Sequence, residues 1–190
     1  MKTVIVNYYT IKELKEINAK GFKKAYNKYL ETYEFLSNHE VTNSIEKFLG
    51  LFDCSWESWD CECGYVGYSE EQIWIYDENK DEEICYSLDE IKGKTLNNYL
   101  LECHHEEMSG WDNCPLTGII YDIELLEPFR KFLTGEDYQD YSLKDLIDKG
   151  CEDLMKMVDR EIENQRSEEY FIEECECNDL YFDINGNMEN

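Results

Sequence analysis

The sequence lacks the short motifs that assign an activity at sight. No glycine-rich phosphate loop, G-x-S-x-G, H-E-x-x-H or zinc-deaminase motif occurs in its 190 residues. The longest apolar run near its start, residues 4–6, is far shorter than a signal-peptide core or a membrane-spanning helix. Linkers rich in serine and glycine are also missing. We therefore expect a cytoplasmic protein that has no membrane contact and is not an enzyme.

Basic residues are scarce. The chain has 18 Lys and Arg against 44 Asp and Glu, a net charge of −26. The net charge of a small domain usually has a magnitude of only about 2–8. Residues 1–50 contain eight Lys and six Glu, so the excess acid lies in residues 51–190, with 10 basic and 38 acidic residues. Such a segment repels phosphate, and we expect no direct binding of nucleic acid.

Large apolar side chains are plentiful in spite of this charge. Hydrophobic residues make up 42% of the sequence, including 15 Tyr, 8 Phe and 4 Trp, which is too many for a disordered chain. Segments with strand and helix periodicity follow one another without internal repeats. The sequence predicts one α+β domain over residues 1–190, with a small, mainly antiparallel sheet packed against several helices.

Local signals place some of these elements. Thr10 followed by Glu13 is typical of a capped helix start, and Gly21 predicts a break between two helical pieces. Residues 54–63 show neither the period of a helix nor that of a strand, and we expect them to form a loop. Residues 65–76 predict two short strands that pair with each other as a hairpin.

A long helix is predicted from Ser142, in the C-terminal third. Its apolar residues share one side, and acidic residues recur every three, four or seven positions on the other. The acidic stripe consists of Asp145, Asp148, Glu152, Asp159 and Glu163. We predict that this stripe binds a partner, with Trp56 and Trp59 as aromatic anchors. The alternatives are a solvated helix face and two core tryptophans.

Nine cysteines are present, an odd number that cannot pair fully within one chain, and in the cytoplasm they should stay reduced. Two aperiodic segments hold residues of the kind that zinc prefers: Cys61, Cys63, Cys103, His104 and Cys114. A structural Zn²⁺ would order both loops, although C-x-C spacing is not the usual C-x2-C knuckle. The alternative is that these thiols are half-buried and pack as small hydrophobic side chains.

Two further patterns in the sequence are similar to known chemical sites. Cys103 or Cys114 beside a histidine could form a nucleophile, but the surrounding glutamates would raise the thiol pKa. The string from Asp183 to Asn187 is similar to a calcium loop without its final acid, and we interpret it as a hairpin turn.

Two stretches resemble a group of small prophage proteins that have no agreed activity. The more specific one is the motif Cys114-Pro115-Leu116-Thr117-Gly118, followed by Tyr121-Asp122, Leu125-Leu126, Pro128 and Ser167-Glu168-Glu169-Tyr170. The other contains Thr10-Ile11-Lys12-Glu13-Leu14, Ala19-Lys20 and Lys24-Ala25. The resemblance implies origin in a phage or mobile element, and hence action inside a bacterial host cell.

In that context a small acidic protein without catalytic motifs is similar in kind to anti-CRISPR proteins that bind Cas nucleases. We therefore expect a stoichiometric inhibitor that occupies the basic nucleic-acid-binding region of a host protein, for example a Cas9-type nuclease. Two alternatives remain. One is a zinc- or thiol-dependent enzyme that uses residues 103–114, and the other is a structural or regulatory phage protein.

Overall fold

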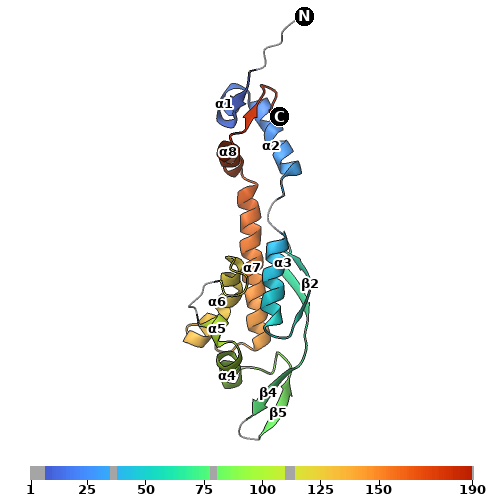
Figure 1. Ribbon diagram of the computed structural model, residues 1–190, viewed down its shortest axis with the longest axis vertical. Helices are drawn as coiled ribbons and strands as arrows, with labels where there is room; N and C mark the ends of the chain where they lie inside the picture. Colours follow the sequence, from blue (N-terminus) through green and yellow to red (C-terminus); the bar gives the residue numbers. More distant parts are fainter. Residues whose placement is uncertain (1–6, 35–37, 78–80, 110–113, 190) are drawn as a thin grey trace, which may run out of the picture. The chain divides into compact units, whose positions relative to one another are not determined.

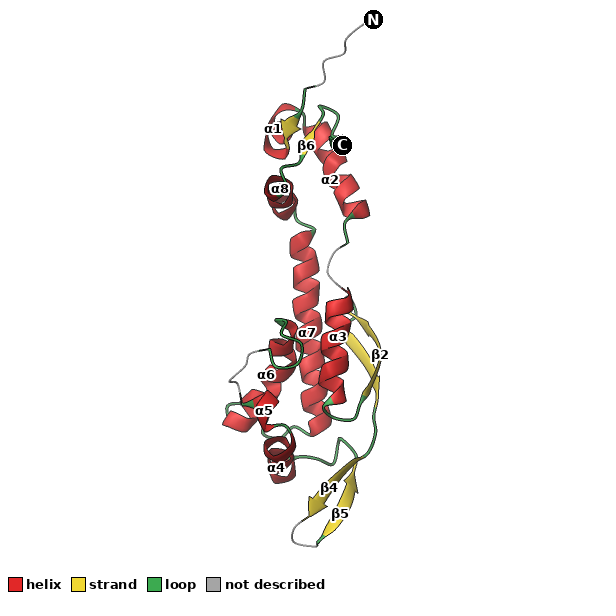
Figure 2. Ribbon diagram, viewed as in Figure 1, coloured by secondary structure: helices red, strands yellow, loops and turns green. Residues whose placement is uncertain are grey.

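The computed structural model describes residues 7–34, 38–77, 81–109 and 114–189 (Figures 1 and 2). The helices are α1 (Ile11–Ile17), α2 (Ala19–Thr32), α3 (Asn38–Gly50), α4 (Gly93–Cys103), α5 (His105–Met108), α6 (Tyr121–Thr134), α7 (Leu143–Gln165) and α8 (Glu168–Cys177). The strands are β1 (Tyr9–Thr10), β2 (Ser55–Asp60), β3 (Tyr65–Ser69), β4 (Ile73–Asp77), β5 (Glu82–Tyr86) and β6 (Tyr181–Phe182). The predicted α+β class and the long C-terminal helix are confirmed.

Across the described ranges the strands form three two-stranded antiparallel sheets, β1–β6, β2–β3 and β4–β5. The antiparallel prediction is thus confirmed, but the strands are divided among separate hairpins and one terminal pair. In the terminal pair Tyr9 lies opposite Phe182, which joins the two ends of the described chain.

Contacts divide the chain into two compact units. Residues 1–36 and 160–190 form one, called here the terminal unit, and residues 37–159 form the central unit. The terminal unit has 9 basic and 14 acidic residues, net −5, while the central unit has 9 and 30, net −21. Whether the chain folds as one domain stays a prediction, because compactness does not tell whether each unit folds alone.

In the terminal unit, α1, α2, α8 and the C-terminal strand enclose a core built around Ile11, Leu14, Phe22 and Phe171. The predicted cap is confirmed, since the Thr10 hydroxyl accepts the Glu13 N–H while the Glu13 carboxylate accepts the Thr10 N–H. Two ion pairs then join α1 to α8, from Lys12 to Glu176 at 2.7 Å and from Lys15 to Glu168 at 2.9 Å.

The break between the first two helices is at Asn18, so the predicted break at Gly21 is wrong. The Asn18 carboxamide oxygen accepts the Lys20 N–H, and its Nδ2 donates to the Ile184 carbonyl at 2.8 Å. Asparagine caps a helix start well because its side-chain oxygen accepts a backbone N–H of the first turn, which has no acceptor within the helix. Gly21 instead lies inside α2, where its missing Cβ lets the carbonyl of Ile184 approach.

In the central unit, α3, α6 and α7 pack around three phenylalanines. Phe52 and Phe129 stack with ring centroids 5.1 Å apart, and Phe48 meets Phe129 edge-on at 5.7 Å. Helix α6 was not predicted, although it spans 14 residues with Pro128 inside it.

The segment predicted as a loop contains strand β2, so this prediction is wrong. A bulge between Trp56 and Ser58 shifts the register of β2 on β3 and breaks the two-residue alternation by which strands are recognised. The strands within residues 65–76 are present, but they do not pair with each other. Strand β3 pairs with β2, and β4 pairs with β5.

The motif at residues 114–118 is tied to the start of α6 by a buried carboxylate. Asp122 is 0% exposed and accepts the N–H groups of Leu116 and Thr117 at 2.9 and 2.7 Å and the Thr117 hydroxyl at 2.8 Å. The Thr117 hydroxyl also lies 3.1 Å from the hydroxyl of Ser44 on α3. The motif therefore has a structural role, because it supplies the donors that a buried carboxylate requires.

Within the described ranges, no helix is both long and apolar enough to cross a membrane.

Candidate protein-binding surface

The predicted acidic stripe on α7 has several partners within the chain. Asp145 forms a capping box with Ser142, whose N–H and hydroxyl it accepts at 2.9 and 2.8 Å. These two hydrogen bonds lower the pKa of Asp145. Glu152 pairs with Lys149 at 3.2 Å and with Lys156 at 2.6 Å, and these bonds lower its pKa too.

The other members of the stripe differ in their surroundings. Asp148 accepts the Tyr68 hydroxyl at 2.6 Å, so strand β3 lies against this part of α7. Asp159 is half-buried and, after burial itself, contributes to the raised pKa of the Cys61 thiol. Glu163 is exposed and belongs to the terminal unit. The stripe thus contributes to the fold, and its role in partner binding stays a prediction.

Trp56 and Trp59 are both half-buried in the β2–β3 hairpin. The Trp59 Nε1–H donates to the Thr42 hydroxyl at 3.0 Å, which ties the hairpin to α3. Trp56 lies opposite Tyr68 across the strands. These contacts are typical of packing residues. They favour the interpretation of the two tryptophans as core residues, and their role as anchors for a partner stays a prediction.

The residues predicted to bind zinc are on different elements. Cys61 and Cys63 lie in the turn between β2 and β3, Cys103 ends α4, and Cys114 begins the segment before α6. The His104 imidazole is buried, with Nε2 3.1 Å from the Tyr99 hydroxyl. Among the described residues no three His, Cys, Asp or Glu side chains come together as a metal site. Zinc stays a prediction, to be decided by elemental analysis of the purified protein.

The thiols lie in surroundings that disfavour the nucleophilic thiolate. Burial and then Glu102 raise the pKa of Cys103, and the Asp60 carboxylate raises that of Cys63. Thiolates are activated by positive surroundings, which these sites lack. No observation in the described part of the chain favours the thiol-enzyme alternative.

Burial of His104 yields a pH-dependent stability. Its ring packs edge-on against Phe52, and burial lowers its pKa below 6.5, against smaller opposing effects of Glu107 and Asp53. The unfolded chain then binds the proton more readily, so this contribution is present above pH 6.5 and is lost as the pH falls through the folded pKa.

We predict that the free energy of unfolding of the wild type, relative to His104→Gln, declines between pH 7 and pH 5, by up to about 1.4 kcal/mol per pH unit. Urea unfolding at a series of pH values measures this difference and cancels the titration of the other groups. A difference that does not change with pH would contradict the buried neutral imidazole.

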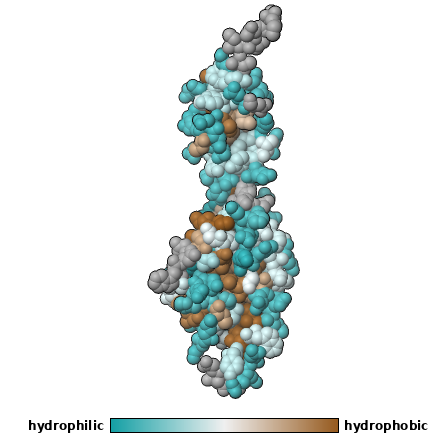
Figure 3. All heavy atoms as spheres, viewed as in Figure 1, coloured by the Kyte–Doolittle hydropathy of each residue, from teal (hydrophilic) through white to brown (hydrophobic). Residues whose placement is uncertain are grey.

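The two hairpins carry many acidic residues and few basic ones. Residues 51–91 contain 13 acidic residues and a single Lys. Hydrophilic residues cover much of the visible face of each unit in Figure 3. Five exposed glutamates on the hairpins and their connections form no ion pair within the described residues: Glu57, Glu62, Glu71, Glu82 and Glu83. We use the name acidic hairpin surface for the exposed side chains of the two hairpins, namely these five residues and the outer face of β4.

The outer face of β4 carries two large aromatic side chains. Trp74 is 63% exposed and lies opposite Cys85, and Tyr76 is 55% exposed and lies opposite Glu83. On the other face Ile73 is 4% exposed, because the residues of a strand alternate between two faces. The hairpin therefore has an apolar face inward and an aromatic face outward. Glu83 lies on the aromatic face, whereas Glu82, opposite Asp77, lies on the face of Ile73.

The sequence analysis missed Trp74 and Tyr76 as contact residues. Their alternation with Ile73 and Ile75 fits a strand with two apolar faces, so the pattern does not tell which face is exposed. The signal that could have identified the surface was the count of one Lys among 13 acids over residues 51–91.

Comparison with known proteins gave no match: no protein family, no characterised protein and no solved structure is significantly similar to the chain. The resemblance to small prophage proteins stays a prediction, and several of its motif residues have structural roles here. Thr117 and Asp122 join two segments of the central unit, and Leu125 and Leu126 are fully buried.

Proposed function

We propose that the protein is a phage-encoded, stoichiometric inhibitor that uses the acidic hairpin surface to occupy the basic nucleic-acid-binding region of a host defence nuclease. A Cas9-type effector is the partner we would test first. The proposal is supported mainly by one observation, the exposed Trp74 and Tyr76 on the same face as Glu83, which forms no ion pair among the described residues.

Electrostatics supplies the encounter. The central unit has a net charge of −21, and a groove lined with Lys and Arg attracts such a surface as it attracts phosphate. Complementary charge mainly raises the association rate and selects the partner. Lasting affinity requires anchors that lose water on binding, and exposed tryptophan is among the residues most often found in that role. Trp74 fits it better than the half-buried Trp56 and Trp59.

The test is binding of the purified protein to a purified Cas9-type nuclease without guide RNA. We expect a one-to-one complex. The protein should compete with guide or target nucleic acid for the nuclease, and its affinity should fall as salt is added. Neutralising the five glutamates together (Glu57→Gln, Glu62→Gln, Glu71→Gln, Glu82→Gln and Glu83→Gln) should weaken binding about 30-fold at low salt, since exposed pairs contribute about 0.2–1 kcal/mol each.

A matched variant removes the same number of charges from exposed glutamates of the terminal unit: Glu16→Gln, Glu34→Gln, Glu169→Gln, Glu173→Gln and Glu189→Gln. It should bind within about threefold of the wild type. Equal weakening by both variants would mean that only total charge matters. No binding to this nuclease, or to other basic effectors of host defence, would overturn the proposal and leave a structural or regulatory role.

A further inference from the structure

A concave site lies within the terminal unit, between α2, α8 and the C-terminal strand. It has a volume of about 350 Å³, within the range typical of small-molecule pockets. Its apolar walls are formed by Tyr29, Tyr33, Phe171, Leu180, Phe182 and Met188. We call it the terminal groove.

The spacing of the residues explains the groove. On α2, Ala25, Tyr29 and Thr32 recur at intervals of three and four and so face the same side as Tyr33. The Tyr29 ring lies 4.9 Å from that of Phe171, between centroids, and its hydroxyl donates to the Gln165 carbonyl at 2.7 Å. The aromatic wall is therefore held in place without a ligand.

Two charged residues line the groove, one from each helix. On α8, Glu174 accepts the Nδ2–H of Asn178 at 2.9 Å. On α2, Lys28 is exposed, and no acidic partner is seen for it among the residues that the structure describes. The cation at the α2 edge is thus available to a ligand, whereas the carboxylate is already hydrogen-bonded.

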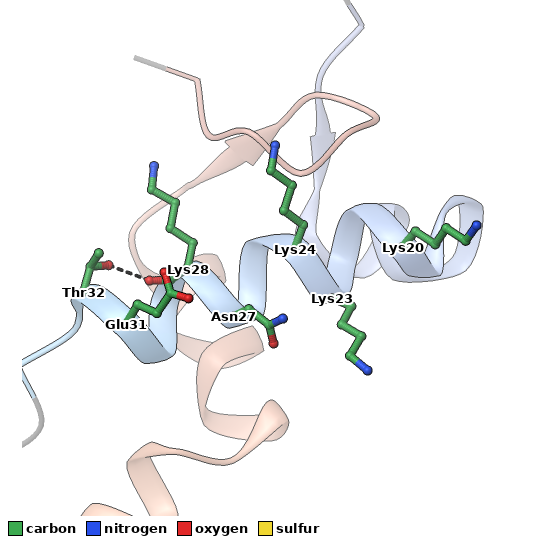
Figure 4. A pocket seen from close by; sticks show the side chains of 7 residues that line it. All are labelled: Lys20, Lys23, Lys24, Asn27, Lys28, Glu31 and Thr32. Carbon is green, nitrogen blue, oxygen red and sulfur yellow. Dashed lines mark hydrogen bonds between the residues drawn. The ribbon is translucent and has the colours of Figure 1, made fainter.

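Lys28 also lines a hollow along α2 together with Lys20, Lys23 and Lys24 (Figure 4). Lys24 and Lys28 point to one side of the helix, and Lys23 points to the opposite side. Lys24 donates to the Asn187 carboxamide at 2.6 Å. Among these lysines, only Lys28 lines both this hollow and the terminal groove.

We propose that the terminal groove binds a small organic anion with a flat aromatic body, its ring among Tyr29, Tyr33 and Phe171 and its anionic group at Lys28. Aromatic walls favour a flat ring, which can stack on or meet their edges. The single available cation selects a negative charge at the α2 edge. This site is separate from the acidic hairpin surface and does not depend on the proposed inhibition.

The probe is 8-anilinonaphthalene-1-sulfonate, with the uncharged N-phenyl-1-naphthylamine for comparison, titrated into the full-length protein by fluorescence. We expect saturable binding of the sulfonate at one equivalent per chain. Lys28→Glu should weaken it at least fivefold and leave binding of the uncharged probe within twofold. Lys23→Glu makes the same change of charge on the opposite side of α2 and should leave both affinities within twofold.

A second pair of variants locates the site. Met188 lines the groove, whereas Ile184 in the same C-terminal segment does not, and both side chains are exposed. Met188→Glu should weaken the sulfonate at least fivefold, and Ile184→Glu should not. Binding that does not saturate, or an equal response to Lys28→Glu and Lys23→Glu or to Met188→Glu and Ile184→Glu, would overturn the proposal.

Discussion

Gly186→Ala is expected to destabilise the terminal unit by roughly 3–5 kcal/mol. Gly186 has φ of 77°, a left-handed conformation that costs other residues about 1–2 kcal/mol. A Cβ at this position would also overlap the carbonyl oxygen of Gly21 on α2, and backbone on both sides leaves little room to shift. Thermal unfolding followed by circular dichroism measures the loss, and hydrogen exchange should locate it in α2 and the C-terminal segment.

The matched control is Gly135→Ala. Gly135 ends α6 with nearly the same φ, 75°, but has open space where a Cβ would be added. Only the conformational effect applies there, and we expect about 1 kcal/mol. Equal effects of the two substitutions would show that the C-terminal turn does not pack against α2 as described.

Asp122→Ala is expected to destabilise the central unit by roughly 3–5 kcal/mol. The substitution leaves two partly buried backbone N–H groups and the Thr117 hydroxyl without the fully buried carboxylate that accepts them, and each unsatisfied group costs about 1–3 kcal/mol when water cannot reach it. It also removes a negative charge from the first turn of α6, where the helix dipole favours it. Urea unfolding should show a lower midpoint with a similar slope.

Asp145→Ala provides the comparison, because Asp145 also accepts backbone and hydroxyl donors at the start of a helix but is exposed to water. Ser142 itself is buried, but the exposed position of the Asp145 carboxylate can be taken by water, so we expect about 1 kcal/mol. A loss for Asp122→Ala no larger than for Asp145→Ala would mean that the segment from residue 114 to 118 is not anchored through this carboxylate.

Local signals were sufficient where one residue decides a local conformation. The caps at Thr10 and Ser142 and the turn from Asp183 to Asn187 were predicted, and all three are confirmed. In the turn the Asp183 carboxylate accepts the N–H groups of Asn185 and Asn187, and the bonds to Asn187 in particular lower its pKa. Such contacts span at most four residues, so the sequence contains both partners within reach of each other.

Predictions that depended on distant partners were less successful. The bulge in β2 exists because β3 pairs with it, and the break at Asn18 is stabilised by a carbonyl 166 residues away. The zinc site stays a prediction and depends on distant partners in the same way, because the type of a side chain does not say which other ligands the fold brings near it.

The sequence by itself determined the α+β class, the long helix at residues 143–165 and the acidic character of the chain, because composition and periodicity are local properties. Tertiary structure decided which acids are available. Pairing and burial engaged Asp145, Asp148 and Glu152 within the chain, and the β4–β5 hairpin left Trp74 exposed on the same face as Glu83. The physical reason is that exposure belongs to a face and its neighbours, which a residue acquires only when the chain folds.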